Sequence, residues 1–343
     1  MLDLFMMKIL VTGGAGFIGS HTVVALIEAG FEPVIVDDFS NSSPMVISRV
    51  EQICGRKLNH YQADCTSTAE LNKIFEEHPD ITGVIHFAAF KAVNESLEMG
   101  ESYYHNNLSS LTNLCTIMRK HGVKKLVFSS SCTVYGIPDQ MKVDEKAPFK
   151  EVTNPYGHTK QLGEFILEGI CKHNPDFDVV LLRYFNPVGA HPSGLIGELP
   201  IGVPSNLVPF VTQTAAGWRE KLTVFGEDYE TEDGTCIRDF IHVVDLANAH
   251  VKALQWTNSN GNIEAFNIGT GKGHSVKEIV EIFQDRTGVS LSHEYGNRRE
   301  GDVPAIFGNT EKANQMLGWK AELSIGDALE HAWKWQQTLE KPE

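Results

Sequence analysis

The sequence predicts an α/β protein with a Rossmann-like, doubly wound parallel sheet and a smaller C-terminal α/β lobe. Short apolar runs alternate with longer segments of helical periodicity, as in a parallel sheet covered on both faces. A glycine-rich turn follows the first of these runs. The alternation stops after about residue 186. We expect a nucleotide-binding domain over 1–185, to which 240–270 returns, and a substrate-binding lobe over most of 186–343.

The individual elements follow from local patterns. The first strand, at 8–12, is rich in β-branched residues, and a helix over 21–29 ends at Gly30. Buried strands are expected at 33–37, 84–88, 125–129 and 179–183. Helices are expected at 103–121, around 156–160, and at 243–255, 275–288 and 325–339. The Gly- and Pro-rich segment 186–206 and the acidic segment 227–235 are predicted to be loops.

Composition excludes several classes of protein. The chain has 343 residues, 42% of them hydrophobic, and a net charge of −15, which disfavours a nucleic-acid partner. No apolar run approaches the ~20 residues of a membrane span, so no membrane association is expected. The six cysteines form no C-x-x-C pair and suggest no metal site. Free thiols in a reducing cytoplasm are the simplest interpretation of these cysteines.

The glycine-rich turn predicts a dinucleotide site. Gly13, Gly16 and Gly19 allow a tight turn and close approach of a pyrophosphate to the backbone and to the following helix N-terminus. Asp37 lies 18 residues after Gly19, where a carboxylate would bond the adenosine ribose and repel a 2′-phosphate. Asp38 follows, and no Arg or Lys appears before Arg49, so NAD is favoured over NADP. A purely structural turn with a solvated Asp is the alternative.

Two further residues are candidates for contacts with the dinucleotide. Asp64 is placed to reach the adenine amino group, although a turn or helix-cap role fits its local sequence almost as well. Lys91 lies just beyond an expected strand end, where it could reach the nicotinamide ribose or a substrate phosphate. An ordinary surface lysine is the alternative there.

A Tyr and a Lys four residues apart predict an acid/base site. Tyr156 and Lys160 share one helix face, and Ser131 or Thr133 follows a strand end and could relay a proton. A free tyrosine has a pKa near ~10, so base strength near neutrality requires the pKa to fall by roughly 3 units. The Lys160 ammonium and an oxidised nicotinamide ring are the expected cations. Helix-face residues without chemistry are the alternative.

These motifs together resemble the extended short-chain dehydrogenase/reductase superfamily. The finer resemblance, from Lys8 to about Trp335, is to the UDP-glucose 4-epimerase family, also called UDP-galactose 4-epimerases. It rests on the segments 86–93 (HFAAFKAV), 129–136 (SSSCTVYG), 182–194 (LRYFNPVGAHPSG), 231–242 (TEDGTCIRDFIH) and 298–302 (RREGD). The family implies NAD as cofactor, a UDP-sugar as substrate and a homodimer formed through the helices around 103–121 and 154–172.

The resemblance also implies particular contacts. For NAD, in addition to the glycines, Asp37 and Asp38, it implies Phe17, Ile18, Asn41, Ser42, Asp64, Cys65, Phe87, Ala88, Ala89, Lys91, Asn106, Ser131, Tyr156, Lys160 and Phe185. For the sugar nucleotide it implies Lys91, Ser131, Thr133, Tyr156, Phe185, Asn186, Asn206, Leu207, Thr223, Phe225, Arg238, Arg299, Asp302 and Ile306. Arg238 and Arg299 would offer forked donors to a pyrophosphate, and Asp302 would accept ribose hydroxyls. Surface ion pairing is the alternative for these three.

The implied reaction interconverts UDP-glucose and UDP-galactose through a transient 4-keto sugar, with Tyr156 as the acid/base. Two positions depart from the family pattern: Ala89 stands where Gly is usual, and Ile306 stands where Tyr or a smaller residue is common. In family terms residue 306 limits room for a 2-N-acetyl group, so UDP-GlcNAc/UDP-GalNAc activity, in addition or instead, remains the alternative. A 4,6-dehydratase lacks support because no Asp-Glu follows Thr133. A UDP-glucuronate epimerase and a silent NAD-binding protein are further rivals.

Overall fold

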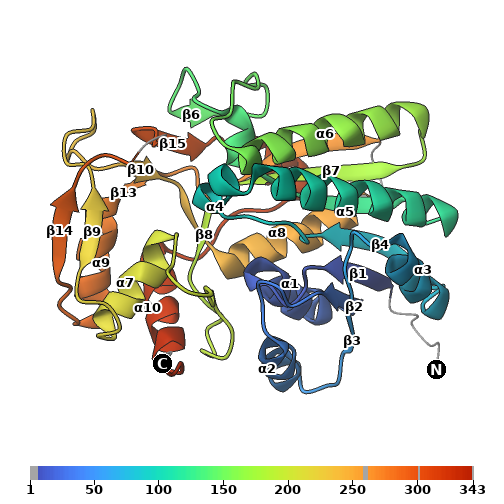
Figure 1. Cartoon of the computed structure of the whole chain (residues 1–343), viewed down its shortest axis with the longest axis horizontal. Helices are drawn as coiled ribbons and strands as arrows, with labels where there is room; N and C mark the ends of the chain where they lie inside the picture. The colour runs from blue at the N-terminus through green and yellow to red at the C-terminus, as the bar shows by residue number, and fades with distance from the viewer. Residues whose placement is uncertain (1–6, 258–261, 300–301, 342–343) are drawn as a thin grey trace.

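The computed structural model describes residues 7–257, 262–299 and 302–341. Its largest element is a sheet with the strand order β12-β7-β5-β4-β1-β2-β3, in which all neighbouring strands are parallel (Figure 1). These strands are β1 (Lys8–Thr12), β2 (Glu32–Asp37), β3 (Asn59–Gln62), β4 (Ile81–His86), β5 (Lys125–Ser131), β7 (Asp178–Tyr184) and β12 (Ile263–Ile268). The winding direction reverses between β1 and β4, which confirms the doubly wound Rossmann-like sheet.

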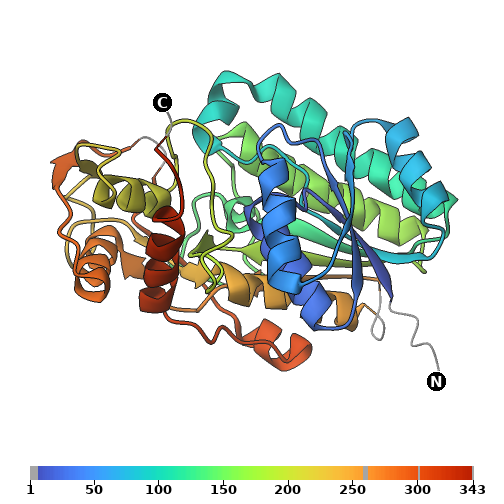
Figure 2. The same ribbon diagram turned by 90° about the horizontal axis from the view of Figure 1, so that it is seen from below.

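Helices cover both faces of this sheet, and alternate residues of each strand serve the two faces. Ile9 and Val11 of β1 pack with one group of helices, and Leu10 packs with the other. The first group is α1 (Phe17–Glu28), α2 (Pro44–Cys54) and α8 (Val243–Trp256), with the π-helical turn η2 (Ala313–Leu317). The second is α3 (Thr68–Glu77), α5 (Gly100–Lys120) and α6 (Pro155–His173). Figure 2 shows both layers edge-on.

A third set of elements forms the lobe at one end of the molecule (Figure 1). Its core is built from Val, Ile, Leu and Phe side chains of three helices that pack against a parallel strand pair. These elements are α7 (Leu207–Ala215), α9 (Val276–Thr287), α10 (Ile325–Gln336), β9 (Leu222–Phe225) and β14 (His293–Gly296). Capping boxes at Ser275 and Ser324 fix the starts of α9 and α10.

Short strands connect the sheet to the lobe. They are β6 (Lys142–Val143), β8 (Asn186–Val188), β10 (Ile237–Arg238), β11 (Phe240–His242), β13 (His274–Ser275) and β15 (Ala305–Gly308). β8 pairs with β11, while β10 pairs with both β13 and β15. The chain then returns from the lobe, because α8 packs on α1 and β12 pairs with β7. The remaining helical pieces are α4 (Val93–Glu98) and the 3-10 turn η1 (Cys132–Tyr135).

The start of α6 is fixed by its sequence. Asn154 is the N-cap, and its side chain accepts a hydrogen bond from the Gly157 N–H at 2.8 Å. Pro155 occupies the first helical position, where its missing N–H costs nothing. Tyr156 therefore lies in the first turn of α6, at the positive end of the helix dipole.

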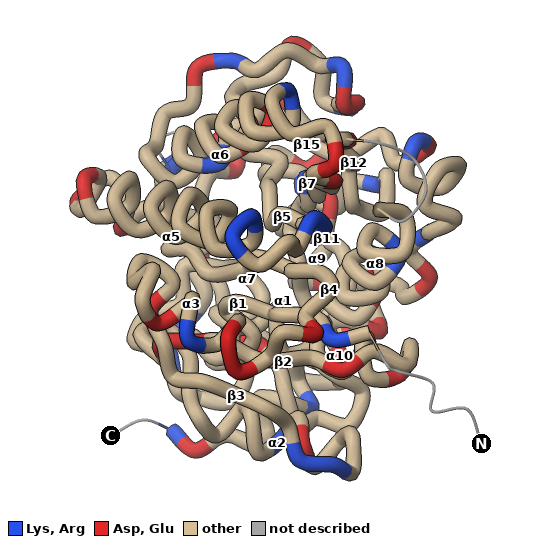
Figure 3. The backbone as a smooth tube through the Cα atoms, turned by 90° about the vertical axis from the view of Figure 1, so that its right-hand side faces the viewer, with Lys and Arg blue, Asp and Glu red and all other residues tan. Residues whose placement is uncertain are grey.

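Charges of both signs are dispersed over the molecule. In the end view of Figure 3, lysines and arginines alternate with acidic residues and form no continuous basic tract among the residues drawn in colour. In the described part of the chain, no helix combines the length and the apolar character that crossing a membrane requires.

Candidate active site

The predicted cofactor-binding and catalytic residues gather along one edge of the large sheet. Parallel strands all end at the same edge, and ligands of doubly wound sheets bind there, beside the switch point. The glycine turn follows β1, Asp37 ends β2, Lys91 comes after β4, Ser131 ends β5 and Phe185 follows β7. The fold thus brings together residues that are far apart in the sequence.

Close packing explains the glycines of the first turn. Gly13 has φ +67°, and a Cβ there would lie 2.8 Å from the backbone nitrogen of Ala88. A Cβ on Gly19 would overlap the carbonyl oxygen of Gly13. The helix α1 begins at Phe17 with no side chain capping its first N–H groups. Those groups are therefore available to a diphosphate, as NAD requires.

Asp37 ties the glycine turn to the segment after β2. Its Oδ2 accepts a hydrogen bond from the Ala15 N–H at 2.9 Å. Its Oδ1 accepts bonds from the Ser42 hydroxyl at 2.7 Å and the Phe39 N–H at 3.0 Å. Burial raises the pKa of this carboxyl, and these bonds counteract the rise. An ionised carboxylate can accept about four hydrogen bonds, so Asp37 retains capacity for a ribose hydroxyl.

The other acidic residues predicted near the adenosine are engaged locally. Asp38 accepts bonds from the Ser40 N–H at 2.8 Å and the Ser40 hydroxyl at 2.7 Å. Asp64 accepts bonds from the Thr66 N–H and hydroxyl, both at 2.7 Å, which is the turn role that its local sequence also suggested. Asn41 is exposed, and Cys65 is buried beside Asp64.

The segment after β4 is held by an asparagine that the sequence analysis did not single out. Asn107 of α5 is buried, and its amide oxygen accepts a bond from the Phe90 N–H at 2.8 Å. Its amide nitrogen donates to the Phe90 carbonyl at 3.1 Å and to the Thr159 hydroxyl at 3.0 Å. Asn107 therefore links the loop of Phe87, Ala88, Ala89 and Lys91 to the helix that carries Lys160. The predicted NAD contact Asn106 is its neighbour and donates to the Asn107 amide oxygen at 3.1 Å.

The predicted proton-transfer residues lie together between β5 and α6. Lys160 is buried, and its Nζ donates to the Ser129 carbonyl at 2.6 Å and lies 5.8 Å from the centroid of the Tyr156 ring. The Ser131 hydroxyl accepts a bond from the Thr133 N–H at 3.2 Å. The Thr133 hydroxyl is buried and has no partner among the described residues. A buried hydroxyl without a partner is costly unless a ligand supplies one.

Burial sets the electrostatics of this pair. It raises the pKa of Tyr156 to about 12, although hydrogen bonding from the Ser131 side chain lowers it. It lowers the pKa of Lys160 to about 8, against the attraction of Glu164. The sequence analysis expected Lys160 to lower the pKa of Tyr156, whereas the Lys160 ammonium points to the Ser129 carbonyl instead. Tyr156 therefore needs a further cation before it can act as a base near neutral pH.

The residues predicted to hold the nucleotide end of the substrate meet in the lobe. Asp302 accepts bonds from Arg238 at 3.3 Å and from Arg299 at 3.2 and 3.3 Å. Arg238 also donates to the Val303 carbonyl at 2.8 Å. The Arg299 guanidinium lies 5.8 Å from the ring centroid of Phe225, which is 48% exposed. This exposed ring at the end of β9, with Arg299 beside it, is suited to stacking on a base next to a diphosphate.

The remaining predicted substrate contacts lie on the short connecting strands and in the lobe. Ile306 is buried and packs with Phe185, Tyr135 and Val143, and Cys132 and Val303 lie against the same cluster. Asn186 starts β8, Thr223 lies within β9, Asn206 is the N-cap of α7, and Leu207 is its first residue. Ile306 thus connects the wall of the site to the turn that carries Ser131 and Thr133.

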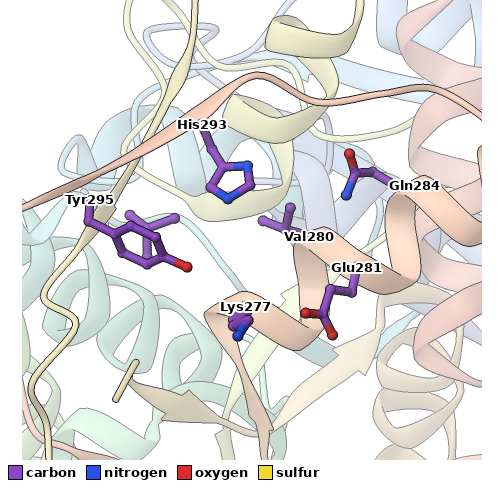
Figure 4. Close-up of a pocket in the computed structure, with 7 residues that line it drawn as sticks. Lys277, Val280, Glu281, Gln284, His293 and Tyr295 are labelled. Carbon is purple, nitrogen blue, oxygen red and sulfur yellow. The ribbon is translucent and has the colours of Figure 1, made fainter. Parts of the chain in front are cut away.

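A separate pocket lies on the outer side of the lobe. Figure 4 shows Lys277, Val280, Glu281 and Gln284 on α9 facing His293 and Tyr295 on β14. The cavity is about 220 Å³, and Val224 of β9 completes its lining. None of the predicted catalytic residues lines it.

Comparison with known proteins agrees with this geometry. Residues 9–269 match the model of the NAD dependent epimerase/dehydratase family. The UDP-glucose 4-epimerase of Dictyostelium discoideum is 50% identical over 330 residues, which cover 96% of this chain and 95% of the relative. That of Bacillus subtilis is 48% identical over 332 residues, or 97% of each chain.

A solved structure shows the same fold. The crystal structure of UDP-glucose 4-epimerase from Bifidobacterium longum in complex with NAD+ and UDP has a TM-score of 0.93 at 44% identity, and covers 96% of this chain and 98% of that one. The sequence matches extend over nearly the whole length of both partners, the C-terminal lobe included. The chain therefore belongs to the NAD dependent epimerase/dehydratase family and, within it, to the UDP-glucose 4-epimerases.

Proposed function

We propose that the protein interconverts UDP-glucose and UDP-galactose by inverting the configuration at C4 of the hexose, with NAD held in the site. The observation that carries the proposal is the pairing of Tyr156 with buried Lys160 beside the unpartnered hydroxyl of Thr133. This group lies at the strand edge that carries the glycine turn, and an arginine pair lies in the adjoining lobe. The full-length similarity to UDP-glucose 4-epimerases supports the same reaction.

The described residues fit NAD, because the glycine turn leaves no room for side chains and the α1 N-terminus has no side-chain cap. NAD, when bound, supplies a positive ring charge and an acceptor that holds the C4 hydride while the sugar is a ketone. Tyr156 takes the proton of the sugar 4-hydroxyl, either directly or through Thr133, and later returns it to the same oxygen. Its place in the first turn of α6 favours the ionised phenolate at that moment.

We propose that the site binds the sugar end of the substrate weakly and the nucleotide end firmly. Inversion requires the 4-keto sugar to turn over within the site, so the sugar must be held loosely while the nucleotide stays fixed. Arg238, Arg299 and Asp302 place the strong, charge-assisted contacts at the UDP end. Remote binding energy of this kind anchors a substrate whose reacting ring remains free to reorient.

We also propose that the two parts of the chain bind different ligands. Residues 1–185, with 240–270, would bind NAD, and most of 186–343 would bind the UDP-sugar; residues 1–6 and 258–261 lie outside the described residues. The glycine turn and Asp37 in the first part and the Arg238–Asp302–Arg299 cluster in the second support this division.

We further propose a homodimer that works in a reducing cytoplasm. The apolar side chains of Leu97 in α4, Met99 just after it and Phe165 in α6 are 62%, 48% and 53% exposed, and their burial would favour such a dimer. All six cysteines are free thiols. Light scattering should give twice the chain mass of 38.0 kDa. A particle of one chain mass, at the concentration where the enzyme works, would exclude the dimer.

The direct test is purified protein with UDP-galactose and no added NAD. We expect UDP-glucose to form, because epimerisation regenerates the oxidised cofactor in every cycle and the cofactor therefore need not be released. The variant Tyr156→Phe should lose nearly all turnover and keep its affinity for UDP. Tyr104→Phe, which removes an exposed hydroxyl bonded to His158 on the same helix pair, is the matched control. No product with wild type, even after NAD is added, would overturn the proposal.

A further inference from the structure

We propose that Glu198 is a positioning residue for the sugar nucleotide, a role that rests on the proposed function. Its Oε1 accepts a hydrogen bond from Lys91 Nζ at 3.4 Å and another from Asn206 Nδ2 at 2.6 Å. Lys91 follows β4 of the large sheet, whereas Asn206 begins α7 of the lobe. One carboxylate oxygen thus ties together two predicted ligand contacts from opposite sides of the site.

The backbone that carries Glu198 is itself held in place. Trp335 of α10 donates from Nε1 to the Glu198 carbonyl at 2.9 Å. Gly197 lies against the same indole, and a Cβ there would overlap the ring. Arg49 of α2 lies 4.9 Å from the centroid of the Trp335 ring and donates to the Leu195 carbonyl at 3.2 Å. In both ribbon views, the segment between β8 and α7 accordingly passes between α10 and α2 (Figures 1 and 2).

As a consequence, the N-terminus of α7 has no side-chain cap. Asn is among the best N-cap residues because its side-chain oxygen usually accepts a bond from the first-turn N–H groups. Asn206 makes no such bond, and its amide is turned toward Glu198 instead. The first N–H groups of α7 keep no side-chain cap, at the positive end of the helix dipole. By holding the Asn206 amide, Glu198 therefore keeps Asn206 from capping the first N–H groups of α7, which would face the diphosphate.

The contact with Lys91 has a second consequence. The Lys91 side chain is 50% exposed, and its ammonium would otherwise sample many rotamers. The carboxylate of Glu198, whose side chain is only 10% exposed, gives the ammonium one preferred direction. The Lys91 charge in turn offsets the repulsion between Glu198 and an incoming diphosphate. Two further N–H groups of Lys91 remain for the ligand.

These contacts act on binding of the nucleotide and touch none of the groups that move the proton. Glu198→Ala removes both contacts, whereas Glu198→Gln keeps an acceptor oxygen for Asn206 and loses the charge opposite Lys91. We expect the Ala variant to raise KM for UDP-galactose and Kd for UDP about tenfold. This corresponds to a loss of about 1.4 kcal/mol in binding free energy, because Lys91 and Asn206 are no longer held in place. kcat should change less than threefold, and Glu198→Gln should recover part of the lost affinity.

The experiment uses the full chain with its bound cofactor, steady-state kinetics with UDP-galactose, and calorimetric titration with UDP. Glu220→Ala, which removes an exposed carboxylate beyond the far end of α7, is the control and should match wild type. Unchanged KM and Kd in Glu198→Ala, or tighter UDP binding, would overturn the proposal. If the Ala variant does not fold, Glu198→Gln must still show weaker UDP binding. Wild type without turnover would instead overturn the proposed function, whereas the UDP titration would still test Glu198.

Discussion

The tyrosine that we propose as the acid/base lies in surroundings that keep it protonated in the absence of a ligand. Burial raises the pKa of Tyr156 to about 12 and lowers that of Lys160 to about 8, so it disfavours the charged form of both side chains. The Lys160 ammonium is held at the Ser129 carbonyl, close to the tyrosine ring but directed away from it. Proton abstraction near neutral pH therefore depends on a cation that arrives with the ligand, in addition to the dipole of α6.

Ile306 offers a test of substrate choice at the scale of one residue. It is buried beside Phe185 and the turn that carries Thr133, so a shorter side chain would enlarge the site next to the sugar. Ile306→Cys should raise turnover of UDP-GalNAc relative to UDP-galactose severalfold, because space for the N-acetyl group is gained. It should also lower stability by about 1–2 kcal/mol through lost packing.

The control for this variant is Val143→Ala, which shortens another buried side chain of the same cluster, on β6. It should lower stability to a similar degree and leave the ratio of the two turnover numbers unchanged. If Ile306→Cys also leaves that ratio unchanged, residue 306 is not what limits acceptance of N-acetylated substrates.

Some residues of the candidate site could be proposed from the sequence, and others could not, for a physical reason. Gly13, Tyr156 and Lys160 stand in local patterns whose spacing already implies a turn or a shared helix face. Glu198 and Asn107 act through partners that lie 107 residues away in one case and 52 in the other. No local pattern marks such a residue, because its role arises only when two distant segments come together.

At the scale of elements, α6 is joined to the sheet by a buried ion pair. Glu164, one turn after Lys160, accepts bonds from Arg183 of β7 at 2.9, 3.2 and 2.5 Å, and from the Ser130 hydroxyl. The Arg183 guanidinium lies 5.2 Å from the ring centroid of Tyr135 and 4.9 Å from that of Phe149. This pair fixes the helix that carries Tyr156 and Lys160 relative to β5 and β7.

Removing one member of this ion pair should lower the stability of the folded protein. Arg183→Met leaves the Glu164 carboxylate buried without its partner, so we expect a loss of about 3–5 kcal/mol in the free energy of unfolding. Urea denaturation measures it. Lys124→Met, which breaks an exposed pair with Asp176, is the control and should change stability little. A loss in Arg183→Met no larger than in the control would show that the buried pair does not hold α6.

The strands of the large sheet were predictable where they are apolar and not where they are polar. β1 occupies the predicted range 8–12, and β5 and β7 extend two residues or fewer beyond theirs. β3 (Asn59–Gln62) was missed because its four residues, NHYQ, lie at the sheet edge and carry no apolar signal. β4 ends at His86 and not at 88, because the Ala88 N–H bonds to the side-chain hydroxyl of Thr12 and not to a backbone carbonyl of a neighbouring strand.

For the molecule as a whole, buried histidines set its tolerance of acid. Burial lowers the pKa of His21, His86 and His242 to about 3, and that of His250 to about 4. Unfolded histidines bind protons below about pH 6.5, whereas these four stay neutral while the chain is folded. Stability is therefore unaffected above pH 6.5 and falls as pH drops from 6.5 toward 4, by up to about 1.4 kcal/mol per pH unit for each histidine.

The slope of unfolding free energy against pH reports histidine protonation, whereas a loss of packing changes the unfolding free energy equally at every pH. His250→Phe removes one buried titrating group beside Phe87 and Tyr184, and its slope between pH 6 and 4.5 should be smaller by about one proton than that of wild type. His60→Phe, which removes an exposed histidine, is the control and should keep the wild-type slope. Equal slopes in wild type and His250→Phe would show that His250 is already protonated in the folded protein.

The sequence predicts the large sheet and its ligand edge better than it predicts the lobe. Alternating apolar runs indicate a parallel sheet, and the glycine turn indicates its ligand edge, because both signals are local. The lobe depends on short strands such as β10 and β15, which hold Arg238 and Ile306 side by side. Strands of two and four residues are too short to show a periodic pattern, so their pairing could not be predicted from the sequence.

The central claim is that the C4 hydride leaves the sugar and returns to the same carbon while Tyr156 handles only the oxygen-bound proton. The measurement is conversion of UDP-galactose carrying deuterium at C4 in ordinary water, with the product examined by NMR. We expect UDP-glucose that keeps the deuterium at C4. Protium at C4 in the product would contradict it, because the C4 hydrogen would then have exchanged with solvent as a proton.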